Sequence, residues 1–421
     1  MSEMTIDTQD AQYAFGIVKA ICEQVGPGIP GSTQERERAA MIQKELEAHL
    51  GAENVVVEEF TVAPWAMLSA YPISALFILF AALLNISIGR FTGVPAWLSA
   101  TAALAFSILS LLTFTFVFVL DQEWVDPFFK KRTSVNVIGT LRRPETKNMK
   151  RLLLLGGHHD SAPENTWLGL PGYGFILASA TWAIGFITML AMSAIQLAGI
   201  ITGNAALARI GTLGWVLLAY PIVPTIIFGM FFNRGRKNGG TVPGAADNLS
   251  ASALGIALCR FLVENPAYIP ADTEIRFISF GSEEAGLRGS RRYVERHLDE
   301  LKRLDARLLN FEVVAFPEIA ILNSDVNGTV KNSPDMVSGV VAAAERARVP
   351  YQVKDAFIGE GSDAGPFSQA GLKAATLLCM KFPQQLIAFY HQKRDRPEVL
   401  TIEPLLNVLK LAFEWVRCGG E

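Results

Sequence analysis

The chain has 421 residues, of which 50% are hydrophobic and 18% charged, and its formal net charge is −3. The charged fraction lies below the roughly 25% of an ordinary soluble chain, and the mean hydropathy is +0.29, so we expect a membrane-embedded part. The slightly acidic balance argues against nucleic-acid binding. Four scattered cysteines without a CxxC spacing indicate neither a zinc ribbon nor a dense disulfide framework. The polar first ten residues do not resemble a cleavable signal peptide.

The amino-terminal segment is typical of a soluble α/β protein. Apolar residues recur at helical spacing over residues 13–25, and a run of glycines and prolines follows. Ser32 and Glu35 predict a capping box at the start of a second helix, which Gly51 ends. The β-branched residues within 54–62 predict a strand.

Two long stretches of the chain carry almost no charge, and each is interrupted by a single arginine, Arg90 or Arg209. About 20 apolar residues in a helix span a bilayer core, and a buried helix of a soluble protein rarely stays uncharged for so long. We therefore predict one membrane hairpin within residues 67–120 and another within 165–233. The predicted spans are residues 67–88, 94–120, 175–200 and 210–232.

The basic residues near the ends of these spans predict their orientation, because such residues favour the cytoplasmic side. Three follow each hairpin: Lys130, Lys131 and Arg132, and then Arg234, Arg236 and Lys237. The opposite side offers only Arg90 and Arg209. We expect a multi-pass integral membrane protein whose soluble part faces the cytoplasm.

The remainder of the chain comprises residues 1–66, 133–164 and 238–421. These roughly 280 residues are enough for one large, discontinuous α/β domain. Strands are predicted at residues 133–141, 152–155, 274–280 and 308–314, and a last amphipathic helix at 404–416. The apolar run 152–155 is typical of a buried strand in a parallel sheet, so the expected fold is a mixed, mostly parallel sheet between helices.

Polar residues follow the predicted strand 152–155, at the edge where open α/β sheets bind their ligands. His158 and Asp160 are two residues apart, so on an extended chain both point to one side. A metal-binding imidazole with a carboxylate that fixes its tautomer fits this spacing. A loop histidine beside a turn aspartate is the structural alternative.

Other acids and a histidine occupy comparable places. Asp247 opens a predicted helix, where an N-cap is the ordinary explanation. Glu283 and Glu284 follow a buried strand, and basic residues of the next helix offer an alternative partner. Glu312 lies within an apolar strand and needs a partner, and His391 precedes a polar loop. Two imidazoles and three carboxylates suit a pair of divalent ions such as zinc.

The order of these motifs resembles the M28 metallopeptidases, a family of co-catalytic zinc aminopeptidases and carboxypeptidase relatives. The motifs are HxD at 158–160, GAxDN at 244–248 and SEExGLxGS at 282–290, followed by NxE and YH. The GIPGS stretch before the second predicted helix also fits, so the resemblance covers essentially the whole soluble part.

The resemblance implies a ligand set for two zinc ions. His158 and Glu312 would bind one ion, Glu284 and His391 would bind the other, and Asp247 would bridge them. The family most often has aspartate at the position of Glu312. The GADDN-like motif also lacks its first acid here but keeps the presumed bridge.

The resemblance also implies three catalytic roles. Glu283 would be the general base, Asp160 would orient His158, and Tyr390 would hydrogen-bond the tetrahedral oxyanion. His159 receives no role and is interpreted as a spacer, and the remaining histidines are expected to be solvated.

The expected function is that of a membrane-anchored exopeptidase with two zinc ions, which removes amino-terminal residues from peptides. Its expected partners are peptide substrates and the lipid bilayer. The second hairpin separates His158 from Asp247 in the sequence, so we expect the active site near the bilayer surface and substrates held there. The alternatives are a glutaminyl cyclase, a carboxypeptidase and a non-catalytic receptor.

Overall fold

The computed structural model describes residues 5–88, 93–143, 145–146, 149–165, 168, 174–213, 240–357 and 359–421. It contains two compact units. The unit that we call the sheet domain comprises Met1–Pro64, Phe129–Glu164 and Gly235–Glu421. The other, the helical unit, comprises Trp65–Phe128 and Asn165–Arg234.

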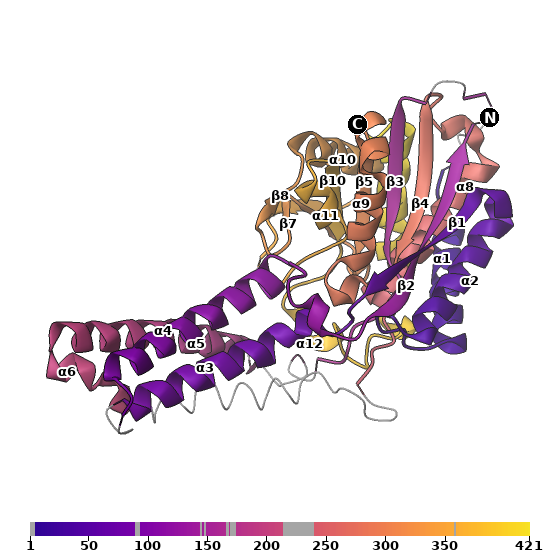
Figure 1. The fold of residues 1–421 in the computed structure, drawn as a ribbon. Helices are drawn as coiled ribbons and strands as arrows, with labels where there is room; N and C mark the ends of the chain where they lie inside the picture. The colour runs from indigo at the N-terminus through magenta and orange to yellow at the C-terminus, as the bar shows by residue number, and fades with distance from the viewer. Residues whose placement is uncertain are drawn as a thin grey trace. The chain divides into compact units, whose positions relative to one another are not determined.

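An eight-stranded sheet with the order β1-β2-β4-β3-β5-β10-β6-β9 forms the centre of the sheet domain (Figure 1). Its strands are β1 (Val55–Val62), β2 (Arg132–Arg142), β3 (Arg151–His158), β4 (Thr273–Phe280), β5 (Arg307–Glu312), β6 (Ile319–Leu322), β9 (Tyr351–Lys354) and β10 (Lys373–Leu378). A separate ladder joins β7 (Ser324–Asp325) to β8 (Val330–Lys331). The pairs β4–β3, β3–β5, β5–β10 and β6–β9 are parallel and the others antiparallel, which confirms the predicted mixed, mostly parallel sheet.

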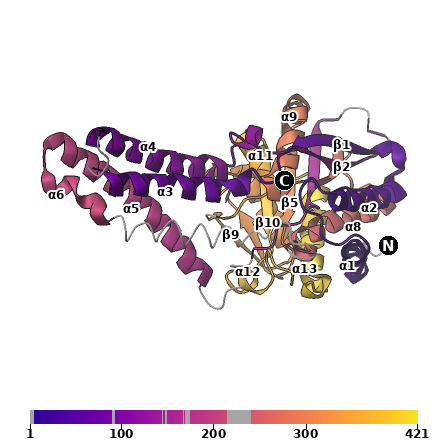
Figure 2. The ribbon, with the colours of Figure 1, turned by 60° about the horizontal axis from the view of Figure 1, so that its bottom comes forward.

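Helices cover both faces of the sheet (Figure 2). One face carries α1 (Thr8–Gln24), α2 (Thr33–Leu50), α8 (Ser250–Glu264), α10 (Pro334–Ala347) and α13 (Ile402–Arg417); the other carries α9 (Arg288–Arg303) and α11 (Ala364–Gln369). The short α12 (Gln384–Ala388) follows β10. Side chains alternate along β3: Leu153 and Leu155 join the core beneath α8, and Leu152 and Leu154 join the core beneath α9. This alternation explains why the strand is apolar throughout.

The predicted elements of the sheet domain are present, with two local corrections. The Ser32 hydroxyl caps α2 by accepting from the Glu35 amide at 3.0 Å. The Glu35 carboxylate, however, accepts from the Gly31 amide at 2.7 Å, so the predicted reciprocal capping box is wrong. Strand β5 ends at Glu312, which therefore lies at the strand end rather than within the strand.

The helical unit contains α3 (Ala70–Ser87), α4 (Ala96–Phe114), α5 (Gly174–Thr202) and the short α6 (Ala205–Ala208). A 3₁₀ turn, Met67–Ser69, precedes α3, and a π turn, Thr115–Val119, continues α4. Helices therefore occupy the first three predicted spans. Most of the fourth, and the basic residues after it, lie outside the described residues.

Small residues make up much of the interior of the helical unit, together with a few large apolar side chains such as Met189. Ala81 and Ala82 of α3 and Ala103 of α4 are buried, whereas bulky neighbours such as Phe80 are exposed. The Asn85 amide donates to the Ser193 hydroxyl at 2.9 Å and so links α3 to α5. Interfaces of small residues joined by polar side chains are typical of helices that associate in lipid.

Candidate metal centre

The predicted site residues converge where three neighbouring strands end. Strand β3 lies between β4 and β5 and is parallel to both. His158, the last residue of β3, is in register with Phe280, the last residue of β4. Glu312 ends β5, and Glu283 follows β4 by three residues. Because parallel strands share a carboxyl edge, these side chains meet at one end of the sheet.

His158 lies at the centre of this group, with its side chain only 1% exposed. Its Nδ1 atom lies 3.4 Å from an Asp160 oxygen. Its Nε2 atom lies 3.3 Å from Asp247 Oδ1 and 3.5 Å from Glu312 Oε1. One ring nitrogen thus faces the carboxylate that can fix the tautomer, and the other faces two potential co-ligands of a metal ion.

Asp247 faces a second histidine with its other oxygen. Asp247 Oδ2 lies 3.0 Å from His391 Nε2, and Glu284 Oε1 lies 3.3 Å from the same nitrogen. The ligand atoms offered by His158, Asp247 and Glu284 all lie within 4.8 Å of one another. The two oxygens of one carboxylate therefore serve two groups of donors, as a bridging ligand would.

The donor set fits a divalent cation. Both ring nitrogens of His158, Oδ2 of Asp247 and Oε1 of Glu284 are buried and have no hydrogen-bond partner within the described part of the chain. Burying polar atoms without partners costs free energy. Imidazole nitrogens and carboxylate oxygens are the ligands that zinc takes in proteins, so a bound cation accounts for their arrangement.

The electrostatics of the site also favour a cation. Burial raises the pKa of Glu312 to about 8 and the pKa values of Glu283 and Glu284 above their usual range. Burial by itself lowers the pKa values of His158 and His391, but the facing carboxylates outweigh it. The pKa of His391 is about 10 as a result, and that of His158 lies well above its usual value. Positive charge placed among these acids would stabilise their ionised forms.

Two aspartates hold the loops that carry the candidate ligands. The carboxylate of Asp160 accepts from the amides of Glu283 and Glu284 at 3.0 and 3.1 Å. The carboxylate of Asp395 accepts from the amides of Ala246 and Asp247 at 2.8 and 3.1 Å. Asp395 therefore ties the loop that follows His391 to the loop of Asp247. The role of Asp395 could not be predicted, because nothing in the sequence distinguishes it from the other polar residues of its loop.

The two remaining predicted residues also lie at this edge. Glu283 Oε2 is 3.7 Å from His158 Nε2, and the Glu283 side chain is 13% exposed, so solvent reaches it. The Tyr390 ring stacks on the His391 imidazole with 3.9 Å between the ring centroids. The structure therefore brings together all eight residues that the sequence singled out.

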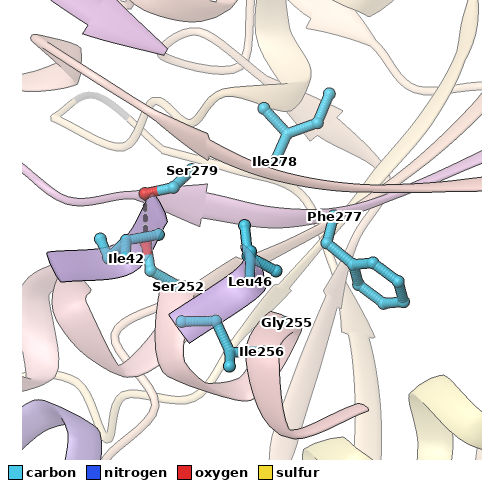
Figure 3. A pocket seen from close by; sticks show the side chains of 8 residues that line it. All are labelled: Ile42, Leu46, Ser252, Gly255, Ile256, Phe277, Ile278 and Ser279. Atoms are coloured by element: carbon cyan, nitrogen blue, oxygen red, sulfur yellow. Dashed lines mark hydrogen bonds between the residues drawn. The ribbon is translucent and has the colours of Figure 1, made fainter. Parts of the chain in front are cut away.

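The interpretation of His159 as a spacer is wrong. Its side chain is fully buried, and its Nδ1 atom lies 2.8 Å from the Ser279 hydroxyl. The Ser279 hydroxyl contacts that of Ser252 at 2.7 Å, in a small pocket between α2, α8 and β4 (Figure 3). Ser252 in turn donates to the His158 carbonyl at 3.3 Å. Burial lowers the pKa of His159 to about 4, so its imidazole is neutral. Through Ser279 and Ser252 it is linked to the backbone of the candidate ligand His158.

The other two histidines, which were expected to be solvated, are partly exposed and each makes a side-chain contact. The Tyr13 hydroxyl lies 2.8 Å from His49 Nε2, and Glu58 Oε1 lies 2.7 Å from His297 Nε2. The first contact joins the consecutive helices α1 and α2, and the second joins β1 to α9. They therefore contribute to packing at positions where the sequence shows only amphipathic helices.

Comparison with known proteins agrees with the geometry of the site. Residues 233–416 match the profile of peptidase family M28. The carboxyl-terminal part of the chain is thus similar to the M28 peptidases. The matched segment contains Asp247, Glu283, Glu284, Glu312 and His391. The family resemblance inferred from the spaced motifs is thereby confirmed.

Aminopeptidase YwaD of Bacillus subtilis is 31% identical to the M28-like chain over 175 residues. That match covers 39% of this chain and 35% of YwaD, so it spans about a third of the relative's length. Two solved structures share the fold. A zinc aminopeptidase from Bacillus subtilis gives a TM-score of 0.53 at 17% identity, with 98% of this chain and 95% of that chain covered. Fimbriiglobus ruber glutaminyl cyclase gives a TM-score of 0.54 at 13% identity, with 99% of this chain and 97% of that chain covered.

Proposed function

We propose that the M28-like chain is a membrane-anchored exopeptidase that uses two zinc ions to remove amino-terminal residues from peptides. The placement of Asp247 carries this proposal. Its Oδ1 lies 3.3 Å from His158 Nε2 and its Oδ2 lies 3.0 Å from His391 Nε2. One buried carboxylate that serves two histidines fits a pair of ions better than a single ion.

The donors divide into two groups around this carboxylate. His158 and Glu312 would hold one ion, His391 and Glu284 would hold the other, and Asp247 would contact both. When bound, such ions lower the pKa of a coordinated water and polarise the scissile carbonyl. The similarity of the fold to that of a zinc aminopeptidase from Bacillus subtilis supports zinc as the metal.

Other side chains would handle the proton and the developing charge. Glu283 would accept a proton from the attacking water and deliver it to the leaving amine, because its partly exposed carboxylate lies beside the candidate ligand His158. Asp160 would orient His158 through Nδ1 while it holds the Glu283 amide. Tyr390, fixed by stacking on His391, would donate a hydrogen bond to the tetrahedral oxyanion.

The helical unit would anchor this domain in the bilayer as a multi-pass unit. The stretches Met67–Ser87, Ala96–Val119 and Ala183–Thr202 are long and apolar enough to cross a membrane. Each insertion leaves the sheet domain and returns to it at neighbouring positions. Val62 pairs with Arg132 at the ends of the first insertion, and Pro163 pairs with Thr241 at the ends of the second. The basic residues after each insertion favour a cytoplasmic sheet domain.

The second insertion supports a preference for substrates near the membrane. It departs from Pro163, three residues after Asp160, and returns at Thr241, six residues before Asp247. Only a few residues of the sequence therefore separate the candidate ligands on each side from the second insertion. We propose peptides released at, or held near, the bilayer as substrates.

A panel of peptides tests the reaction. The full chain in lipid nanodiscs should cleave peptides with a free amino terminus and leave amino-blocked peptides intact, whereas blocking the carboxyl terminus should have little effect. Chelator should stop cleavage, and zinc should restore it. Cleavage of amino-blocked but not carboxyl-blocked peptides would indicate a carboxypeptidase instead. No zinc-dependent cleavage of any peptide would overturn the proposal.

A second candidate function is the cyclisation of amino-terminal glutamine, which is favoured by the fold shared with the Fimbriiglobus ruber enzyme. The two reactions give different masses, because cyclisation releases ammonia whereas hydrolysis consumes water. A glutamine-initiated peptide and its alanine-initiated counterpart, analysed by mass spectrometry, would separate them. Two zinc ions per chain would favour hydrolysis, and one would favour cyclisation.

Membrane association and orientation need tests of their own. A lipid-tethered peptide should be cleaved faster than the same peptide without its tether when the chain is in nanodiscs, and equal rates would contradict the proposed substrate class. In sealed vesicles with known orientation, protease added to the cytoplasmic side should digest the sheet domain. Protection from that protease would reverse the orientation.

A further inference from the structure

Helix α2 carries an arginine whose side chain is fully buried, Arg38. Its guanidinium donates only to main-chain carbonyls in the hydrogen bonds that the described residues show. Nε and Nη2 donate to Gly26 at 2.8 and 2.6 Å, Nη1 donates to His159 at 3.0 Å, and Nη2 donates to Pro243 at 2.5 Å. One planar group thus joins three segments of the backbone.

Two of these segments carry candidate metal ligands. The His159 carbonyl belongs to the residue after His158, and Pro243 comes four residues before Asp247. The second insertion separates these two segments in the sequence, so their distance depends on tertiary contacts. The backbone pairing of Pro163 with Thr241 holds them together beside the insertion, and Arg38 holds them together next to the candidate ligands. The third segment, at Gly26, is the glycine-rich loop before α2. Its Gly28 contacts the same strand end, because the Ser161 amide donates to the Gly28 carbonyl at 2.9 Å.

The surrounding loops leave no spare room for the guanidinium. A Cβ atom added at Gly28 would lie 2.7 Å from Cδ of Arg38, closer than real contacts allow. Gly244, next to Pro243, has a φ of +68°, and a Cβ there would meet the Ser161 side chain at 2.8 Å. Gly28 therefore lets its loop approach the arginine closely, and Gly244 lets the Pro243 loop pack against Ser161, next to the arginine.

The arginine also brings positive charge to the rear of an acidic site. Burial lowers the pKa of Arg38 to about 10, while Asp160, Asp395 and Glu35 act to raise it, so the group is charged at neutral pH. Burying a charge costs free energy unless opposite charges and hydrogen bonds compensate for the lost water. Here the nearby acids include the two that hold the loops of Glu283 and Asp247.

We propose that Arg38 is a positioning residue of the metal centre, which fixes the segment of His158 relative to the segment of Asp247. This inference rests on the proposed function for the identity of the ligands. Lysine cannot replace arginine here, because its donors radiate from one nitrogen and cannot span three separated carbonyls. Loss of the guanidinium and its hydrogen bonds should let the two segments shift and should weaken metal binding.

Zinc affinity of the full chain, measured by competition with a chromophoric chelator, tests this role without any need for catalysis. The variants are Arg38→Lys, which keeps the charge, and Arg38→Met, which removes it. The matched control is Arg260→Lys, since Arg260 of α8 contacts Asp10 and the Tyr13 ring instead of the site. Supporting contacts of this kind contribute about 10–100-fold to metal affinity. We expect a loss of at least about tenfold in both Arg38 variants and less than threefold in the control.

Melting temperatures with and without zinc distinguish positioning from general support. A residue that only stabilises the fold would lower both temperatures equally and leave zinc affinity unchanged, which would overturn the inference. If Arg38→Met does not fold, Arg38→Lys and Gly28→Ala, which crowds the arginine, decide the question by the same measurement. Tight zinc binding by the unaltered chain and by all variants alike would refute the inference but leave the proposed function standing. Failure of the unaltered chain to bind zinc would overturn both.

Discussion

Helices α4 and α8 both belong to stretches long and apolar enough to cross a membrane, yet they have different surroundings. In the stretch of α8, Ala245–Glu264, 89% of the most apolar window is buried within the protein, compared with 28% for Ala96–Val119 of α4. Leu254 and Leu258 of α8 lie in the core of the sheet domain. In α4 the small residues Ala100 and Ala103 are buried, whereas Leu109 is exposed.

The difference shows that length and hydropathy do not identify a membrane span by themselves. A helix that buries its large side chains belongs to a protein core, whereas one that exposes them and buries small ones is suited to lipid. The sheet domain should therefore carry the chemistry and depend on water for its folding. The helical unit should carry the membrane anchor.

The largest effect is expected from Glu283→Gln in the sheet domain. Loss of a general base lowers rates by about 10²–10⁴-fold, so kcat for peptide cleavage should fall by that factor while zinc content stays unchanged. Glu47→Gln is the control, since Glu47 of α2 accepts a hydrogen bond from Gln43 and lies outside the candidate site. Rates of single-residue release and metal analysis of the same samples provide the measurement. Full activity of Glu283→Gln would show that the base lies elsewhere.

A matched pair of substitutions tests the comparison of the two helices directly. Leu258→Asp places a charge in the core under the sheet and should destabilise the sheet domain by about 3–5 kcal/mol or prevent its folding. Leu109→Asp places the same charge on an exposed position of α4. It should change the unfolding free energy of the sheet domain by less than about 0.5 kcal/mol. It should make membrane insertion of the helix less favourable by roughly 2.5–3.5 kcal/mol.

Denaturant unfolding and a glycosylation reporter of helix insertion measure these two effects. If Leu109→Asp inserted as well as the unaltered helix, α4 would not be a membrane span. If residues 245–264 inserted in the same reporter while they remained buried in the folded chain, the burial pattern would be the only distinction between the two helices.

Much of the sheet and of the site was predictable because both depend on local patterns. Apolar runs such as 152–155 mark buried strands, and the residues after them mark one edge of the sheet. The contacts of Arg38, His159 and Asp395 were not predictable, since their partners are backbone groups brought close only by the complete fold. Nothing in a sequence marks a carbonyl as an acceptor.

The prediction of a reciprocal capping box at α2 was wrong for a related reason. The motif correctly placed Ser32 at the helix start, but the Glu35 side chain is recruited by tertiary contacts. Besides the Gly31 amide, it accepts from the hydroxyls of Ser134 and Ser282. A buried carboxylate with three donors from three segments takes the arrangement that satisfies the most of them. The local reciprocal bond is then lost.

Removal of metal should produce an intermediate effect that is confined to the sheet domain. A ligand at a hundred times its Kd stabilises the folded state by about 2.7 kcal/mol, so chelation should lower the unfolding free energy of the sheet domain by that amount. The helical unit contains none of the candidate ligands and should not respond. Hydrogen exchange of the two units, with and without chelator, provides the measurement. Equal loss of protection in both units would contradict independent roles.

The smallest effect is expected from acid, and it should be confined to the sheet domain, which contains all five histidines of the chain. Burial lowers the pKa of His49 below the usual 6.5, so the unfolded chain binds its proton more readily than the folded chain. The stability that the neutral imidazole permits is therefore present above about pH 6.5 and declines as the pH falls through that value toward the lower pKa of the folded state. His49→Gln removes this proton uptake but keeps a polar group near the Tyr13 hydroxyl. Urea unfolding at about pH 7 and about pH 5 should thus show a smaller loss of stability in His49→Gln than in the unaltered chain. An identical loss in both proteins would mean that other groups of the sheet domain, and not the partly buried His49, govern its response to acid.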